Sequence, residues 1–176
     1  TKCMNDWQIS LSQKNLLSSL FSVIDSSEIY KALDVGSGRT SIFYLTDKFK
    51  DIKVMGIVYP DDQRKIQPIK ECVKNTNYEL VETDIKNFDF SQEFDVTLAH
   101  LFLGEAGKFA ENNFEEILNK LFEIKTKYLV MINLFRDNIN YNLLLKKIAE
   151  MGNIIKTAYT KSEDGDECIG LTIQFK

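Results

Sequence analysis

Hydrophobic positions along this chain follow two patterns. Some segments have apolar residues at helical spacing, and others are short continuous apolar runs, which are typical of buried strands. The segment from Ile9 to Ile24 has apolar residues at helical spacing, with serines filling the other face. Four short apolar runs then predict buried strands, at Ala32–Val35, Ile52–Tyr59, Tyr78–Val81 and Phe94–Leu98. Helical spacing returns between the first and second of these runs, at positions 42–49, and a helix is expected between the second and third, within 62–75.

Pro68 bears on where that last helix starts. The residue before a proline disfavours helical geometry, so Gln67 is a poor helical position and the regular helix is expected to begin only at Pro68.

The second half of the chain has the clearest helical pattern, an apolar stripe with the spacing i, i+3, i+4, i+7, i+8. Its members are Phe114, Ile117, Leu118, Leu121 and Phe122. The run Tyr128–Ile132 predicts a further strand.

Another helix follows that strand, with Asp137 or Asn138 as its cap and Gly152 as its stop. Its expected buried face is made of Tyr141, Leu144, Leu145 and Ile148. Two final strands, Ile154–Thr160 and Cys168–Phe175, are joined by a turn at Asp164-Gly165.

Strands that alternate with helices need crossover connections, which produce a parallel sheet with helices on both faces. The terminal hairpin adds an antiparallel strand. We therefore predict an α/β fold with a doubly wound, mixed, seven-stranded sheet. At 176 residues the chain has room for one domain. It divides into an N-terminal helical extension, residues 1–28, and an α/β core, residues 29–176.

Charge and composition limit the kinds of partner and metal site that are expected. The net charge is −4 and the sequence pI is about 5.1, whereas phosphate contacts need Lys and Arg, so a nucleic-acid partner is not expected. The apolar runs are far shorter than the ~18 residues of a membrane span, and neither a membrane span nor a signal peptide is expected. The single histidine excludes a two-histidine metal site, and no metal is expected. Three widely spaced cysteines without a CxxC pair predict reduced thiols in a cytoplasmic protein.

The most informative stretch runs from Leu33 to Ser41 and contains Asp34, Gly36, Ser37 and Gly38. It leaves a buried strand and enters a helix, where glycines let the backbone pass close to a ligand. Asp34 would repel a pyrophosphate. The second strand also ends in Val58, not in the acid that binds the ribose of a dinucleotide. A nicotinamide-dependent dehydrogenase is therefore only the third most favoured function.

With these residues the chain resembles the class I S-adenosylmethionine-dependent methyltransferases. The run from Asp34 to Gly38 is similar to that family's first motif, an acid-x-Gly-x-Gly loop. Thr83-Asp84-Ile85 looks like its adenine-contacting motif, and Phe94-Asp95-Val96 resembles its fourth motif. The resemblance covers about residues 29–176 and includes the strand order and the terminal hairpin.

The resemblance implies S-adenosylmethionine as cofactor. Asp34 would help to hold its amino acid part, directly or through water. Gly36 and Gly38 would allow the cofactor to approach closely, and Ser37 between them is also expected at the cofactor. Asp84 would accept a hydrogen bond from the adenine amino group, and Ile85 would supply a backbone N–H. The expected acceptor of the methyl group is a small molecule or a peptide.

The sequence also departs from the family pattern at the ribose. Val58 occupies the position of the ribose-binding acid, so Asp61 is the nearest candidate, and its alternative role is a charge at a helix N-terminus. A methyltransferase-like binding or regulatory module without turnover is therefore the second reading.

The other candidate site residues can also have purely structural roles. His100 lies just past the fourth strand and is a candidate general base, or a loop histidine bonded to backbone groups. Asp84 can instead cap a short helical turn at Ile85–Asn87, and Asp34 can be a strand-end or helix-cap acid.

Overall fold

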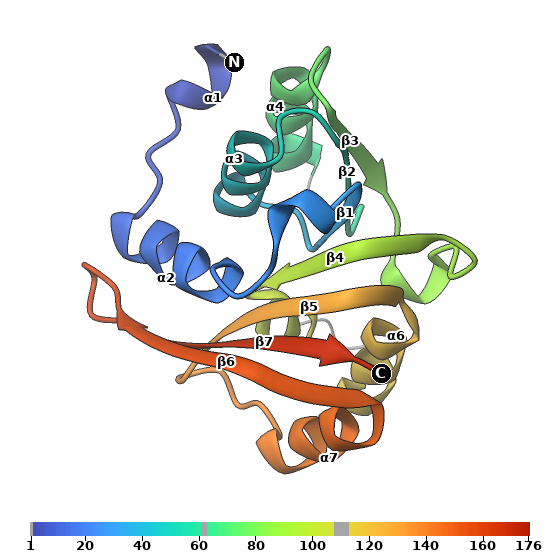
Figure 1. Ribbon diagram of the computed structural model, residues 1–176. Coiled ribbons are helices and arrows are strands. Elements are labelled where there is room, and N and C mark those ends of the chain that lie inside the picture. Colours follow the sequence, from blue (N-terminus) through green and yellow to red (C-terminus); the bar gives the residue numbers. More distant parts are fainter. Residues whose placement is uncertain (1, 61–62, 108–112) are drawn as a thin grey trace.

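A single sheet with the strand order β3-β2-β1-β4-β5-β7-β6 organises the computed structural model, in which residues 2–60, 63–107 and 113–176 are described (Figure 1). Its strands are β1 (Lys31–Val35), β2 (Lys53–Val58), β3 (Tyr78–Glu82), β4 (Glu93–His100), β5 (Lys125–Leu134), β6 (Gly152–Lys161) and β7 (Glu167–Phe175). Strands β1 to β5 pair in parallel, and β7 pairs antiparallel with both β5 and β6. The predicted mixed seven-stranded sheet and terminal hairpin are confirmed.

Helices cover both faces of this sheet (Figure 1). They are α1 (Lys2–Asn5), α2 (Leu11–Phe21), α3 (Arg39–Lys48), α4 (Gln63–Val73), α5 (Phe102–Ala106), α6 (Phe114–Glu123) and α7 (Tyr141–Met151). Two 3-10 turns, η1 (Ser26–Glu28) and η2 (Ile85–Asn87), complete the described elements. No helix within the described ranges combines the length and the apolar character needed to cross a membrane.

Two apolar clusters, one on each face, form the core. Successive residues of β5 belong to opposite clusters: Leu129 and Met131 pack with α6 and α7, whereas Val130 and Ile132 pack with α2 and α3. Both sets are almost fully buried. A strand that is buried on both faces has a continuous apolar sequence. The central strands could therefore be predicted from the sequence.

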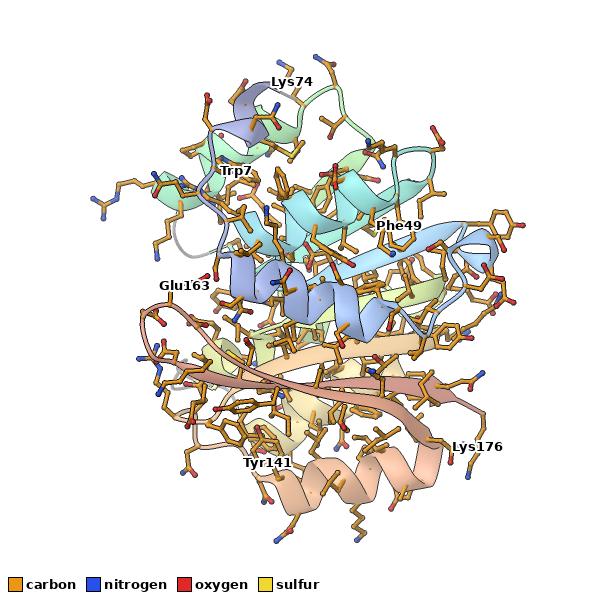
Figure 2. The ribbon with its side chains drawn as sticks, turned by 60° about the vertical axis from the view of Figure 1, so that its left-hand side comes forward. Trp7, Phe49, Lys74, Tyr141, Glu163 and Lys176 are labelled. Carbon is orange, nitrogen blue, oxygen red and sulfur yellow. A yellow bond between two sulfur atoms is a disulfide. The ribbon has the colours of Figure 1, made fainter. Side chains whose placement is uncertain are left out.

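Helix α2 is anchored to the hairpin tip. Ser10 caps the helix, and Glu163 accepts hydrogen bonds from the Ser12 N–H (3.1 Å) and from the hydroxyl groups of Ser10 (2.7 Å) and Ser12 (2.9 Å). Figure 2 shows Glu163 at the hairpin end beside the start of this helix. A carboxylate at a helix N-terminus is favoured by the helix dipole, so this contact fixes how the N-terminal extension sits on the sheet.

Two expectations about helices were wrong in detail. Helix α4 begins at Gln63 and contains Pro68. Its buried residues Ile66, Cys72 and Val73 lie at helical spacing, and this amphipathic packing outweighs the local cost of proline.

Helix α7 is capped by Asn140, whose side chain accepts the Leu143 N–H, rather than by Asp137 or Asn138. Leu145, expected on its buried face, is 47% exposed.

The expectation of three reduced thiols was also wrong. Cys3 and Cys72 form a disulfide, whereas Cys168 is free and buried. The bond is possible because α1 packs against the last turn of α4, which brings two Cα atoms 69 residues apart to 5.6 Å. A cytoplasmic location stays a prediction.

Replacing Cys3 by serine should lower the free energy of unfolding by about 4 kcal/mol, because the unfolded chain loses a cross-link over a long loop. Urea denaturation without reductant measures this difference. With a dithiol reductant the wild type and Cys3→Ser should unfold at the same midpoint. A gap that persists under reduction would contradict this account.

Candidate cofactor site

The glycine loop between β1 and α3 is folded back onto β2. The N–H groups of Gly36 and Ser37 both donate to the Ile57 carbonyl, at 2.9 and 3.0 Å. Gly36 has a φ of +75°, a conformation that favours glycine. A side chain there would also approach the Phe102 ring of α5 to 2.9 Å. Backbone strain and crowding therefore both require a glycine at this position.

A fully buried carboxylate lies beneath this loop. One oxygen of Asp34, Oδ2, accepts hydrogen bonds from the hydroxyl groups of Ser41 and Tyr78, both at 2.7 Å. Ser41 Oγ in turn accepts the Gly38 N–H at 3.1 Å, and the Tyr78 hydroxyl lies 2.5 Å from Ser37 Oγ. Burial raises the pKa of Asp34 to about 7, against the opposing effect of its hydroxyl partners. This carboxylate therefore supports the loop from below.

A cavity of about 610 Å³ opens at the carboxyl ends of β1, β2 and β3. In an open parallel sheet this edge is where ligands bind. One wall is the glycine loop with Arg39, and another is the end of β2 with Tyr59. Helix α4 supplies Ile66, Pro68 and Ile69, and α5 and α6 supply Phe102, Ala106 and Ile117. The walls are therefore mostly apolar, with charged groups from the ends of helices.

The structure brings together five of the residues singled out from the sequence. Gly36, Ser37, Gly38, Asp84 and Ile85 all line the cavity, although Asp84 and Ile85 come from the far side of the sheet edge, after β3. Their assembly follows from the strand order β3-β2-β1, which places the loops after β1 and β3 on either side of β2.

Asp34 and Asp61 are placed differently. Asp34 does not line the cavity; it lies behind the loop and bonds to Ser41 and Tyr78. Asp61 lies outside the described residues, and its role at a ribose stays a prediction. Val58, at the position where a ribose-binding acid was expected, lies in the cavity wall.

Asp84 has the predicted capping role and lies at the cavity, and its contact with adenine stays a prediction. It caps η2, accepting the Lys86 N–H at 3.0 Å, and its other oxygen lies 3.8 Å from Lys86 Nζ. Its side chain is 18% exposed, and it lines the cavity. A carboxylate can accept several hydrogen bonds, so the cap leaves acceptor capacity for a ligand.

His100 belongs to a different polar group. It ends β4, and its Nε2 lies 2.8 Å from Gln13 Oε1 of α2. Gln13 also donates to Ser162 Oγ (3.2 Å) and contacts Cys168 Sγ (3.3 Å), so these residues link α2, β4 and the hairpin. His100 is not among the residues that line the cavity. Burial lowers its pKa to about 4, which leaves the ring neutral at physiological pH.

Sequence reasoning missed Tyr78, Arg39 and the α4 wall. Arg39 begins α3, lines the cavity, and lies 5.8 Å from the ring of Trp7 in the N-terminal segment labelled in Figure 2. One signal was available for Tyr78. Gly56 stands in the middle of β2, and a glycine inside a strand marks a close approach by another group. A side chain at Gly56 would overlap the Tyr78 hydroxyl.

No protein-family model matches this chain, and no curated protein matches it by sequence. Solved structures do. The N-methyltransferase NodS from Bradyrhizobium japonicum WM9, in complex with S-adenosyl-L-homocysteine, aligns over 93% of this chain and 85% of its own with a TM-score of 0.67 and 14% identity.

The plantazolicin methyltransferase BpumL, also in complex with S-adenosylhomocysteine, aligns over 94% of this chain and 83% of its own, with a TM-score of 0.66 and 16% identity. The 16S rRNA methylase RmtB aligns over 94% of this chain and 62% of its own, with a TM-score of 0.66 and 15% identity. The chain therefore has the class I methyltransferase fold.

The single histidine makes its titration directly measurable, since any imidazole signal belongs to His100. We expect an NMR titration to give a pKa near 4, because burial disfavours the charged ring. A free imidazole acting as a base in an open site would titrate near ~6.5. A midpoint near that value would contradict the burial seen here and restore His100 as a candidate base.

Replacing Asp34 by asparagine should change how stability depends on pH. The pKa of Asp34 is raised from 3.8 to about 7 in the folded protein, so its contribution to stability is complete below pH ~4 and is lost as pH rises through about 7. The variant lacks this loss. Relative to wild type, Asp34→Asn should therefore gain on the order of 4 kcal/mol in unfolding free energy between pH 4 and 8.

Asp89→Asn is the matched control. Asp89 is exposed, and its pKa is lowered by hydrogen bonds from Ser91, so its contribution to stability is lost as pH falls. Removing it should move the stability difference in the opposite direction. If Asp34→Asn and Asp89→Asn show the same pH trend, the Asp34 carboxyl is not desolvated as described.

Proposed function

We propose that this chain is a methyltransferase that binds S-adenosylmethionine in the cavity at the glycine loop. One observation carries the proposal: the Gly36–Gly38 loop and the Asp84-Ile85 pair line the same 610 Å³ cavity, at the edge of the sheet where this fold binds ligands. The structural similarity to NodS and BpumL, both in complex with S-adenosylhomocysteine, supports the same cofactor.

Two features of the described residues fit this cofactor. Gly38 lines the cavity, and a side chain built there would meet no atom within 4 Å, so the loop leaves open space at this position. Oδ1 of Asp34 is buried without a hydrogen-bond partner among the described residues. A buried, unpaired carboxylate oxygen favours a cation in its neighbourhood. The cofactor carries two cationic groups, an ammonium and a sulfonium.

When bound, S-adenosylmethionine supplies an activated methyl group on its sulfonium centre. The protein's part is to bind and orient. Asp84 would accept a hydrogen bond from the adenine amino group, and Ile85 would donate its backbone N–H. The apolar side chains of Val58, Ile66 and Phe102 would flank the adenine ring. Holding donor and acceptor in line contributes up to ~7–11 kcal/mol in favourable cases.

The acceptor that we propose is a small molecule or a peptide. The chain carries a net charge of −4, which disfavours a nucleic-acid acceptor. His100 faces Gln13 outside the cavity lining, so deprotonation of the acceptor by His100 is the least supported part of the proposal. An acceptor that presents a free lone pair needs no such base.

A second function, a methyltransferase-like binding module without turnover, is favoured by two residues, Val58 and His100. Val58 replaces the acid that would hold the ribose, and His100 is held away from the cavity. The two functions differ in turnover. Cofactor binding without turnover would favour the module, and no binding at all would favour it more strongly.

The test is calorimetric titration of the wild type with S-adenosylmethionine and S-adenosylhomocysteine. Asp84→Ala should weaken binding by ~1.5–3 kcal/mol, because a buried hydrogen-bond acceptor is lost. Asp89→Ala is the matched control, since Asp89 also accepts from the backbone two residues on but does not line the cavity. It should bind like the wild type.

Three outcomes separate the readings. No binding of either compound by the wild type would refute the cofactor role. Full affinity in folded Asp84→Ala would remove Asp84 from the site. Binding together with no release of S-adenosylhomocysteine from any small-molecule or peptide acceptor would favour the module without turnover.

A further inference from the structure

Tyr78 reaches the glycine loop from two strands away. It is the first residue of β3, yet its hydroxyl lies 2.7 Å from Asp34 Oδ2 at the end of β1 and 2.5 Å from Ser37 Oγ in the loop. Strand β2 lies between, and the Tyr78 hydroxyl passes over it at Gly56, where any side chain would overlap both hydroxyl groups. The absence of a side chain at Gly56 therefore makes this contact possible.

When Asp34 is ionised, the two short contacts of the Tyr78 hydroxyl allow one arrangement of the hydrogen atoms. Asp34 Oδ2 accepts from both Ser41 and Tyr78, so the single proton of the Tyr78 hydroxyl is committed to Asp34. The short contact between Tyr78 and Ser37 then requires Ser37 to be the donor. This direction holds while Asp34 is ionised, because a proton on Oδ2 would reverse the contact with Tyr78 or with Ser41.

This direction sets what Ser37 offers to a ligand. Ser37 lines the cavity, and its Oγ lies inside the loop, beside the Tyr78 hydroxyl and 3.5 Å from the backbone carbonyl oxygen of Asp34. The lone pairs that remain on Oγ can only accept a hydrogen bond. A serine that is free to rotate could present either a donor or an acceptor. With its proton committed to Tyr78, Ser37 Oγ would accept a hydrogen bond from a donor group such as an ammonium.

We propose that Tyr78 is a positioning residue for the ligand's amino acid part: it holds Ser37 as a hydrogen-bond acceptor toward the cofactor's ammonium group. This inference rests on the proposed function. It concerns the glycine-loop end of the cavity, whereas the adenine contacts come from Asp84 and Ile85.

The experiment compares two ligands by calorimetry. S-adenosylhomocysteine carries the amino acid part, and 5′-methylthioadenosine has the same adenosine and thioether without it. Tyr78→Phe removes one oxygen and keeps the buried ring. We expect it to weaken S-adenosylhomocysteine binding roughly tenfold and to leave 5′-methylthioadenosine binding unchanged. Tyr30→Phe, the same change at a tyrosine that is 73% exposed, is the matched control and should alter neither affinity.

A second variant guards against a folding defect. Ser37→Ala should show the same selective loss, and adding Tyr78→Phe to it should cost no further affinity, because Tyr78 acts through Ser37. Equal weakening of both ligands in folded Tyr78→Phe, or no weakening of either, would overturn the positioning role while leaving the cofactor proposal intact. A wild type that binds neither ligand would refute the proposed function and this inference together.

Discussion

The site depends on one buried carboxylate. Asp34 is the penultimate residue of β1 and has no exposure to solvent, and removing a carboxyl group from water is costly unless its oxygens are hydrogen-bonded. Here Oδ2 is paired twice, with Ser41 at the start of α3 and with Tyr78 of β3. Through these two hydroxyl groups the carboxylate holds the Gly38 N–H and the Ser37 side chain. The shape of the glycine loop is therefore fixed from inside the protein.

The cavity itself is a consequence of topology. The strand order places β1 between β2 and β4, so the chain leaves β1 toward one face of the sheet, through α3, and leaves β4 toward the other, through α5. The divergence opens a crevice at the carboxyl edge. A side chain at Gly36 would come within 2.9 Å of the Phe102 ring, so the glycine loop and α5 lie close together on one side. Helix α4 closes the other with Ile66, Pro68 and Ile69.

The N-terminal extension keeps His100 apart from the residues that line the cavity at the carboxyl edge of the sheet. Helix α2, fixed by Glu163, turns Gln13 toward His100 and away from the lining of the cavity. The shorter α1 is linked to α4 by the Cys3–Cys72 disulfide, and Trp7 lies over Arg39 at the cavity wall. The extension thus supports the cavity on one side while it holds His100 on the other.

Local patterns were enough to determine the fold class. The apolar runs of the central strands, the stripe from Phe114 to Phe122 and the Asp164-Gly165 turn each encode their element through neighbouring residues, and strand–helix alternation implies a parallel sheet. The sequence also predicted five residues that line the cavity, because they belong to short motifs at strand ends. They are Gly36, Ser37, Gly38, Asp84 and Ile85.

Only the tertiary structure decided the rest, because it depends on residues that are distant in sequence. The direction of His100 is set by Gln13, 87 positions away, and the disulfide by the packing of α1 on α4. Tyr78 meets Asp34 across 44 positions, in a space that exists only because Gly56 lacks a side chain. A sequence determines such contacts through the whole fold, since no local pattern specifies which buried hydroxyl group will reach which carboxylate.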